Sequence, residues 1–332
     1  MAVRLKDVAE AAQVSIALVS NYVNGKSTAR MSNATRDRID EALRALDYRP
    51  NLLAQMLRRG GESRKVGIIT SGFKNEVTTQ TLIHLQEIFL EHNYTLMIYH
   101  TKNEVGLLRT GYQEMLRSGC AGVIAHGQRW HIGDFPLPQV IMSSGERLQE
   151  SLPEIFCDYR PGVSALLDHL ESLGHKKVLF ITLKLGGTTS RYRSFTERFG
   201  TEDVFTVSRP QDLTPAKVRE IVESCPGATA AFCSNDLLAL ALRESLSALG
   251  VKVPEEFSVA GFDNTLLSEL CLLTTVDQAL ERRCRSAANA LLNLIEKRCD
   301  PVEYYIPAEL IVRNSCAQAK ISRKESVHVS SN

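Results

Sequence analysis

The stretch VAEAAQVSIALVSNYVNGK, residues 8–26, decides how the N-terminal part of this chain folds. It is rich in small residues, and its charged side chains are Glu10 and Lys26. Apolar residues recur at helical spacing before and after a predicted tight turn at Gln13-Val14. Two helices this short cannot form a core by themselves, so the stretch predicts a small unit that needs further packing.

A third helix is predicted to begin near Ser32 and to complete this unit. Its apolar residues repeat at i, i+3, i+4 and i+7, which is the pattern of one buried helical face. These residues are Ile39, Ala42, Leu43 and Leu46. Three short helices with small residues at the crossing point are typical of a helix-turn-helix, whose second helix enters the major groove of DNA.

The charge of the chain is unevenly distributed. The formal net charge is +1 over 332 residues, yet residues 1–65 hold 12 Lys or Arg against 7 Asp or Glu. A basic head on a mildly acidic body indicates a head that binds a polyanion.

Several residues of the head also occur in order and spacing that mark one family. They are Lys6-Asp7-Val8-Ala9, Ala12, Val14-Ser15, Val19-Ser20, Val23-Asn24, Ser32, Thr35-Arg36 and Tyr48-x-Pro50-Asn51. In these positions the head resembles the lactose-repressor (LacI/GalR) family of bacterial transcription regulators. The resemblance implies a sequence-specific DNA-binding regulator, in most cases a repressor, with a helix-turn-helix domain over residues 1–49.

The second helix carries the residues that we expect to face DNA. Ile16, Ala17 and Asn21 are predicted to read bases, because Asn can pair with adenine while Ile and Ala can touch thymine methyl groups. Ile16 could instead pack on the surface of the head. The predicted phosphate contacts, which position the protein without specifying sequence, are Ser15, Ser20, Asn24 and Arg36.

A hinge is expected over residues 50–64, most of which lies in the stretch RPNLLAQMLRRGG at residues 49–61. Pro50 ends the third helix, and Asn51 can cap a helix of about two turns, which is too short to be stable alone. The resemblance implies that this helix forms on operator DNA, where Leu57, with Ala54 on the same face, enters the minor groove and kinks the duplex. A plain linker helix is the alternative.

From residue 65 to 316 the chain alternates apolar strands with helices. Strands are predicted at 66–70, 95–100, 121–127, 139–144, 177–182, 205–207, 230–234 and 257–262. Helices are predicted at 79–92, 104–118, 161–173, 192–199, 215–224 and 236–249. This alternation predicts an α/β fold with two doubly wound parallel lobes, and ligands of such sheets bind beyond the carboxyl ends of the strands.

Landmarks of the body extend the same resemblance to about Ser315. They include Leu173-Gly174-His175, Ser234-Asn235-Asp236, Gly261-Phe262-Asp263-Asn264 and Leu273-Thr274-Thr275-Val276. The resemblance implies the periplasmic-binding-protein type I fold and a small effector between the lobes. Lobe one is expected over about 65–157 and 280–307, lobe two over about 158–278 and 308–316, and residues 317–332 form a polar tail.

The predicted effector contacts are polar side chains that follow strands, since convergent carboxylates and guanidinium groups suit a sugar or a phosphorylated sugar. They are His126, Asp158, Arg191, Asn235, Asp236, Asp263 and Gln278. Phe73 and Trp130 are candidates for an apolar platform. Two alternatives stay open: Asp236 as a helix cap and His126 as an ordinary surface histidine.

Other features narrow the function. The tail lacks leucine heptads, so we expect a homodimer that matches a palindromic operator. No secretory signal, membrane span, metal-ligand spacing or catalytic motif is visible, and so we expect a cytoplasmic protein that is not an enzyme and has no cofactor. The alternative is a soluble cytoplasmic ligand-binding module without a role at DNA.

Overall fold

The structure is a computed structural model, and it describes residues 5–23, 31–46, 63–73, 76–127, 135–145, 147, 152–183 and 190–320. The chain divides into two compact units, Met1–Ser63 and Arg64–Asn332. Predictions for Asn24, the hinge residues Asn51, Ala54 and Leu57, and Trp130 lie outside the described residues.

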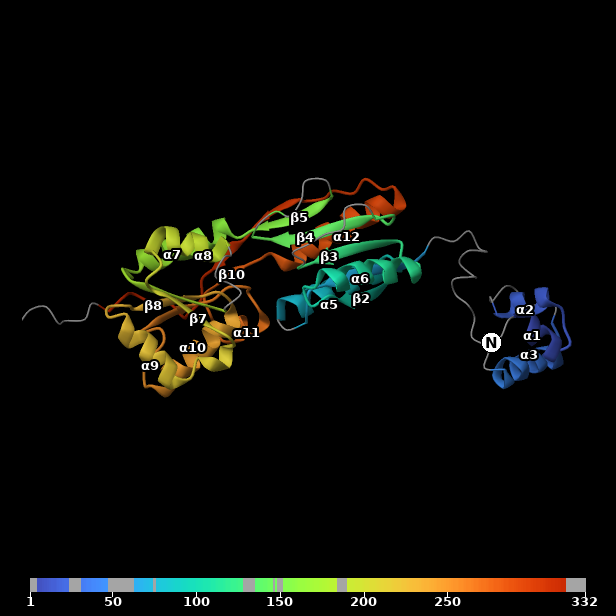
Figure 1. The fold of residues 1–332 in the computed structure, drawn as a ribbon, viewed down its shortest axis with the longest axis horizontal. Helices are drawn as coiled ribbons and strands as arrows, with labels where there is room; N and C mark the ends of the chain where they lie inside the picture. The colour runs from blue at the N-terminus through green and yellow to red at the C-terminus, as the bar shows by residue number, and fades with distance from the viewer. Residues whose placement is uncertain are drawn as a thin grey trace, which may run out of the picture. The chain divides into compact units, whose positions relative to one another are not determined.

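The described residues of the head form three helices, as the sequence predicts (Figure 1). They are α1 (Leu5–Ala11), α2 (Ile16–Val23) and α3 (Asn33–Ala45). Their shared core consists of Val8, Ala9, Ala12, Val19, Ile39 and Ala42. Gln13 adopts a φ of +54°, which turns the chain sharply between α1 and α2. Small alanines let the short helices pack closely enough to bury this modest apolar set.

The larger sheet of the second unit is entirely parallel, with the strand order β11-β5-β4-β3-β1-β2. Its strands are β1 (Lys65–Thr70), β2 (Thr95–His100), β3 (Gly122–His126), β4 (Gln139–Ser144), β5 (Glu154–Asp158) and β11 (Tyr305–Pro307). The central strands are buried along their length, because helices cover both faces of the sheet.

The helices of lobe one divide between the two faces of this sheet. One face packs against α5 (Glu76–Glu91) and α12 (Leu280–Glu296), whose apolar residues join those of β1, β3, β4 and β5 in one cluster. The other face packs against α6 (Val105–Arg117) through Leu108, Tyr112 and Met115. This double covering is the doubly wound arrangement that the sequence predicts.

The second sheet is also parallel, in the order β7-β6-β8-β9. Its strands are β6 (Val178–Leu183), β7 (Val204–Val207), β8 (Ala230–Cys233) and β9 (Ser258–Ala260). One face carries α7 (Arg160–Ser172) and α8 (Ser190–Phe199), and the other carries α9 (Pro215–Ser224) and α10 (Asp236–Ala248). The short helices η2 (Pro210–Asp212) and α11 (Leu266–Leu270) complete lobe two.

The chain passes between the lobes after β5, before α12 and after β11. Near these passages β10 (Thr275–Asp277) pairs antiparallel with β12 (Glu309–Ile311). Because β5 and β11 are parallel and both leave lobe one at their ends, the carboxyl ends of the larger sheet face lobe two (Figure 1). The predicted fold class is therefore confirmed, while β5, β10, β11, β12, α11 and α12 were not among the predicted elements.

Candidate functional site

One face of α2 is open to solvent. Ile16, Ala17 and Asn21 are exposed, Ser20 is half-buried, and Val19 on the opposite side is fully buried in the head core. Ile16 is 47% exposed although it is large and apolar, so a substantial part of its side chain is open to contact. The structure thus brings the three predicted base-reading residues to one surface that a duplex could contact.

Ser15 caps this helix, as its position before the helix predicts. Its hydroxyl oxygen accepts a hydrogen bond from the backbone N–H of Leu18 at 3.2 Å. A serine hydroxyl has one donor besides its acceptor lone pairs, so the O–H of Ser15 can still donate to a phosphate. Ser15 is exposed, which leaves room for that contact.

Tyr22 fixes α2 against α3 through a polar contact. Its hydroxyl lies 2.8 Å from both carboxylate oxygens of Asp40 and donates to them. This hydrogen bond raises the pKa of Tyr22 above its ordinary value. Arg36, a predicted phosphate contact, is half-buried on the same helix as Asp40.

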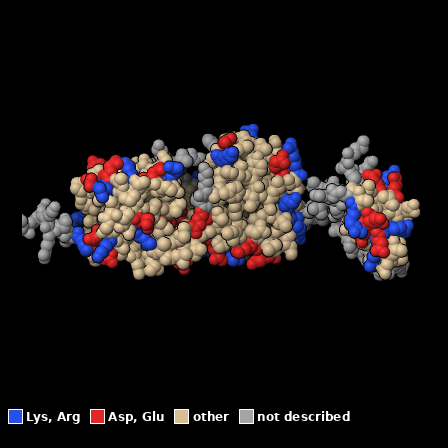
Figure 2. All heavy atoms as spheres, turned by 90° about the horizontal axis from the view of Figure 1, so that it is seen from below, with Lys and Arg blue, Asp and Glu red and all other residues tan. Residues whose placement is uncertain are grey.

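The three helices are not themselves basic. Residues 5–23 and 31–46 contain 4 Lys or Arg and 5 Asp or Glu, and Figure 2 shows both signs on the head. The basic excess of the N-terminal region therefore comes from residues that flank the helices, among them Lys26, Arg58 and Arg59.

At the junction of the lobes, Asp263 occupies a strained backbone position. Its φ is +123°, a region that L-residues rarely adopt, and its N–H donates to the Val276 carbonyl at 2.9 Å. Burial raises the pKa of its carboxyl to about 7, although the positive charge of Arg191 opposes this. Strain and a shifted pKa at one residue are typical of a binding site.

Gln278 connects Asp263 to lobe one. Its Nε2 donates to Asp263 at 2.5 Å, while its Oε1 accepts from the Tyr159 hydroxyl at 2.9 Å and from Arg283 Nη1 at 3.1 Å. Arg283 belongs to α12 and also donates to the Ser143 carbonyl of β4 at 3.2 Å. These bonds form a chain from the sheet of lobe one to Asp263 of lobe two.

Arg191 projects from α8 over two aromatic rings. Its guanidinium carbon lies 4.5 Å from the centroid of Phe262 and 5.3 Å from that of Tyr159. Its Nη1 donates to the Ser234 carbonyl at 2.6 Å, and its Nε is buried without a partner among the described residues. One donor of this predicted effector residue thus remains available.

Asn235 and Asp236 are both engaged within the fold. Asn235 caps α10 by accepting from the Leu238 N–H at 2.8 Å. Asp236 is 1% exposed and accepts from the Thr265 N–H at 2.8 Å and from the Thr275 hydroxyl at 2.6 Å. Burial raises the pKa of Asp236. Its carboxylate positions the segment that follows Asp263, which is a structural task different from a helix cap.

His126 and Phe73 lie at the carboxyl edge of the larger sheet. His126 ends β3 and is 7% exposed, so it is not the surface histidine of the alternative interpretation. Burial, together with the charge of Arg283, lowers its pKa to about 3. Phe73 is exposed and packs edge-on against His100, with ring centroids 5.2 Å apart.

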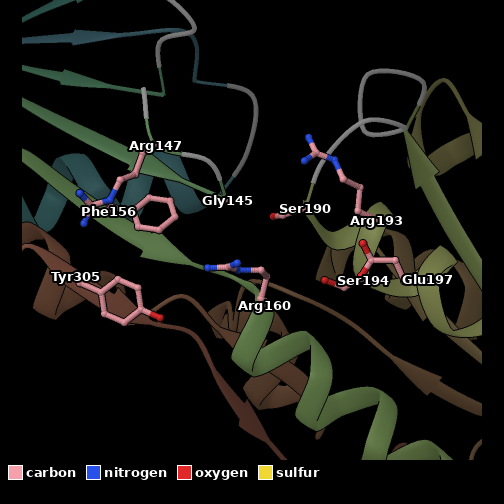
Figure 3. Close-up of a pocket in the computed structure, with 9 residues that line it drawn as sticks. All are labelled: Gly145, Arg147, Phe156, Arg160, Ser190, Arg193, Ser194, Glu197 and Tyr305. Carbon is pink, nitrogen blue, oxygen red and sulfur yellow. The ribbon is translucent and has the colours of Figure 1, made fainter. Parts of the chain in front are cut away.

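A pocket of about 550 Å³ opens between the lobes (Figure 3). None of the predicted effector residues lines it, although Asp158 contacts two residues that do. Asp158 accepts from Arg160 Nη2 at 2.6 Å and from the Tyr305 hydroxyl at 3.0 Å, and the bond from Arg160 lowers the pKa of Asp158. The pocket is lined by Gly145, Arg147, Phe156, Arg160, Ser190, Arg193, Ser194, Glu197 and Tyr305.

Tyr159 and Arg283 were not predicted as site residues. Tyr159 directly follows β5, a strand absent from the predicted elements, and Arg283 belongs to the run ERRCR at residues 281–285. A run of charges usually marks a solvated helix face, so the sequence contains no signal that one of these arginines is buried. Within the described ranges, no group of acidic, histidine or cysteine side chains is arranged to hold a metal, and no helix has the length and hydropathy of a membrane span.

Comparison with protein-family models gives two matches. Residues 4–51 match the model described as "Bacterial regulatory proteins, lacI family". Residues 167–316 match the model described as "Periplasmic binding protein-like domain". The two matches fall on the head and on the second unit.

Curated relatives match over almost the full chain. The HTH-type transcriptional regulator PtxS of Pseudomonas aeruginosa is 28% identical over 328 residues, covering 94% of this chain and 95% of the relative. The HTH-type transcriptional repressor PurR of Haemophilus influenzae is 27% identical, covering 94% of this chain and 98% of the relative. A ribose operon repressor of Halalkalibacterium halodurans is 24% identical, with coverages of 94% and 96%.

Solved structures share the fold. The lac repressor dimer bound to operator and the anti-inducer ONPF superposes with a TM-score of 0.70 at 21% identity, covering 96% of this chain and 100% of that structure. A periplasmic binding protein/LacI transcriptional regulator from Alkaliphilus metalliredigens, complexed with D-xylulofuranose, has a TM-score of 0.64 at 22% identity. This superposition covers 76% of the present chain and 99% of the Alkaliphilus metalliredigens structure.

Proposed function

Since the chain belongs to the lacI family of bacterial regulatory proteins and is therefore a DNA-binding regulator, we propose that it is a repressor controlled by a small effector. In this proposal a homodimer binds a palindromic operator, and an effector between the lobes changes operator affinity. The observation that carries this proposal is the exposed face of α2. This helix belongs to the head, whose sequence matches the lacI family model.

The head would read the operator through α2. Asn21 would pair with a base edge, and Ile16 and Ala17 would contact thymine methyl groups. Ser15, Ser20, Asn24 and Arg36 would hold phosphates and set the register. The exposure of Ile16 at 47% supports this role, because an isolated apolar side chain on a reading helix gains contact when it reaches a thymine methyl.

The hinge would add a second contact in the minor groove. We propose that Asn51 caps a short helix on the operator, that Ala54 lies beside its symmetry mate, and that Leu57 separates a base step. This part of the proposal depends on the sequence resemblance alone, since α3 ends at Ala45 and Pro50 and the hinge lie outside the described residues.

The effector would bind between the lobes, near Asp263, Arg191 and Gln278. These side chains lie where the carboxyl ends of the larger sheet face lobe two, which is where ligands of doubly wound sheets bind. Asp263 and the available Nε of Arg191 offer an acceptor and a donor for hydroxyl groups. Relatives that are named as a ribose operon repressor and a sucrose operon repressor favour a sugar or a phosphorylated sugar. The remaining predicted residues would surround this site: His126, Asp158, Asn235, Asp236 and Phe73.

A homodimer is supported by an apolar surface on α5 and α11. Ile83 of α5 is 51% exposed, and Leu266 and Leu270 of α11 are 57% and 71% exposed. The two helices adjoin, because Glu76 at the start of α5 accepts from the N–H of Leu266 at 3.1 Å. Such a surface suits a second copy of the chain, and two-fold symmetry suits a palindromic site.

The alternative of a ligand-binding module without a role at DNA is disfavoured by the regulatory-family match at residues 4–51. We propose that the protein acts in the cytoplasm, where bacterial DNA lies, and that it performs no catalysis. The matched family model and the curated relatives describe transcriptional regulators, which supports a regulatory role rather than a catalytic one.

The test is selection of bound duplexes from a random DNA pool, repeated in the presence of a panel of sugars, sugar phosphates, sugar acids and nucleosides. The expected result is enrichment of a palindromic sequence, and one class of ligand should change its recovery. Equal recovery of all duplexes with every ligand would contradict the proposal.

A further inference from the structure

Arg283 carries a buried positive charge that has no counter-ion among the described residues. The side chain is 1% exposed, and its two hydrogen bonds go to neutral acceptors, Gln278 Oε1 at 3.1 Å and the Ser143 carbonyl at 3.2 Å. Its Nε is buried without a partner in this part of the chain. A guanidinium group that is removed from water without a carboxylate is strongly unfavourable, so this arrangement needs an explanation.

The groups around Arg283 do not supply the missing charge. The pKa of His126 is lowered to about 3 by burial, so its imidazole is neutral. Burial raises the pKa of the Cys157 thiol to about 11, and burial also raises the pKa of Tyr159. The neighbouring carboxylates are committed elsewhere: Asp158 to Arg160 and Asp263 to Gln278.

The position of Arg283 places this charge at the ligand-binding edge of the fold. Ser143 stands one residue before the end of β4, at the edge of the larger sheet that faces lobe two. The Oγ of Ser143 is also buried without a partner among the described residues. Two unsatisfied polar groups therefore lie together where a doubly wound sheet binds its ligand.

The adjoining pocket has the same sign of charge. Gly145, two residues after Ser143, is one of the residues that line this pocket. Three arginines and one glutamate also line it (Figure 3). Ser190 at the start of α8 also lines it, and its buried Oγ has no partner within the described ranges. Because Arg160 in this wall is paired with Asp158, the pocket adds only a small excess of positive charge to that of Arg283.

We propose that the effector carries an anionic group, a carboxylate or a phosphate on a polyhydroxylated skeleton, and that Arg283 is its counter-ion. This inference rests on the proposed effector site and names its ligand class. The Nε of Arg283, together with a terminal nitrogen, forms the fork that binds a carboxylate or phosphate with two parallel hydrogen bonds.

Binding of an anion at Arg283 also explains how the effector would change the contact between the two lobes. Gln278 shares its Oε1 with Arg283 and its Nε2 with Asp263. The terminal nitrogen beside Nε is Nη2, so an anion in this fork competes with the Ser143 carbonyl for Nη2. The guanidinium group then shifts, and its Nη1 bond, which fixes Gln278 against Asp263, is disturbed. The ligand therefore disturbs a link between the lobes at the residue whose backbone is strained.

The first test compares the full-length variants Arg283→Met and Arg282→Met without ligand. Arg282 precedes Arg283 on the same helix but is exposed and paired with Glu303 and Glu309, so it is a matched control. Without ligand, the charge of Arg283 is uncompensated, and Met replaces it with an apolar side chain. If the role of Arg283 is to bind an anion, Arg283→Met should therefore unfold at the same temperature as the unaltered protein or at a higher one. A lower melting temperature than that of Arg282→Met would show a structural role and overturn the inference.

The second test measures melting temperature in sodium phosphate and in sodium chloride at equal ionic strength. Phosphate should raise the melting temperature of the unaltered protein and of Arg282→Met by more than that of Arg283→Met, because phosphate also stabilises any folded protein by exclusion from its surface. The absence of a shift in the unaltered protein, or an equal shift in Arg283→Met, would overturn the inference. Gluconate and glucose 6-phosphate, each against glucose, separate the carboxylate from the phosphate, with an affinity gain of roughly tenfold or more expected for the acidic form.

Operator binding separates this inference from the proposed function. If a neutral sugar changes operator affinity and acidic sugars do not, the regulator proposal stands and the anionic effector is wrong. If anions bind at Arg283 and operator affinity never changes, the anion site stands and effector control is wrong.

Discussion

Tyr22 of α2 donates its hydroxyl hydrogen to Asp40 of α3, at 2.8 Å from both carboxylate oxygens. The bond joins the proposed reading helix to α3, the longest of the three described head helices. It lies beside a core of only six buried apolar residues among those described in the head. A polar contact therefore contributes much to the orientation of α2, since apolar burial there is limited.

Replacement of Tyr22 by Phe should loosen the head. The loss of a hydrogen bond to a charged acceptor costs about 1.5–3 kcal/mol when the acceptor is buried, and less here because both groups are half-buried. Faster amide hydrogen exchange is expected in residues 5–23 and 31–46, with no change in residues 64–320. Tyr304→Phe alters an exposed tyrosine of the body and serves as the control. Equal exchange in both variants would contradict this role for Tyr22.

Asn21→Ala should weaken operator binding by about 1–3 kcal/mol and relax preference at one base pair, because an adenine-pairing side chain is lost. Fluorescence anisotropy with operators altered one base pair at a time would measure both effects. Gln113→Ala, an exposed amide on α6, is the control and should change nothing. A uniform loss on every duplex would show that Asn21 contacts the backbone only.

Operator affinity should fall linearly with the logarithm of salt concentration. Since the three head helices hold 4 basic and 5 acidic residues, we expect the flanking arginines to set the slope. Arg58→Ala should reduce the slope by about 0.9 for the one phosphate released. Titrations at several salt concentrations would measure it, and an unchanged slope would mean that Arg58 does not touch DNA.

The pKa of about 7 for Asp263 predicts a pH dependence of stability. The ordinary pKa in the unfolded chain is lower, so the folded state binds more protons between the two values. This group therefore stabilises the fold at low pH, and its contribution is lost as pH rises through about 7. In Asp263→Asn, urea unfolding at pH 5 to 8 should show a shallower fall of stability with pH. If the free energy of unfolding depended on pH equally in the two proteins, the raised pKa of Asp263 would be refuted.

The apolar surface on α5 and α11 predicts the oligomeric state. Leu270→Glu places a charge where a second copy would bury a leucine, so sedimentation velocity should show monomers at concentrations where the unaltered protein is dimeric. Leu116→Glu, on the exposed end of α6 over the other face of the sheet, is the control. A persistent dimer in Leu270→Glu would place the interface elsewhere.

The sequence predicted strands and helices well where apolar runs were bounded by turns. The strands at 95–100 and 139–144 and the helix at 215–224 have the predicted bounds. By contrast, α12 begins LERRCR, and its charges conceal an amphipathic helix that buries Cys284, Ala287 and Leu291. The strand β5 was missed because EIFCD is short and carries acidic residues at both ends.

The candidate effector site was less predictable, because side-chain partners come from distant segments. Asp236 and Thr275 are 39 positions apart, and only the fold shows that their bond occupies the carboxylate. Tyr159 and Gln278 meet across 119 positions. Residue type and position after a strand were sufficient to select Asp263 and Arg191, but not to distinguish an available donor from a satisfied one.

The bond between Glu76 and Leu266 joins the first turn of α5 to the first turn of α11, and so spans the two lobes at the edge of the apolar surface. Any rearrangement that separates the lobes must break or move this bond, and with it the surface offered to a second copy. Dimerisation and effector binding are then thermodynamically reciprocal: each must strengthen or weaken the other by the same factor. Apparent effector affinity should consequently depend on protein concentration throughout the range where monomers and dimers coexist.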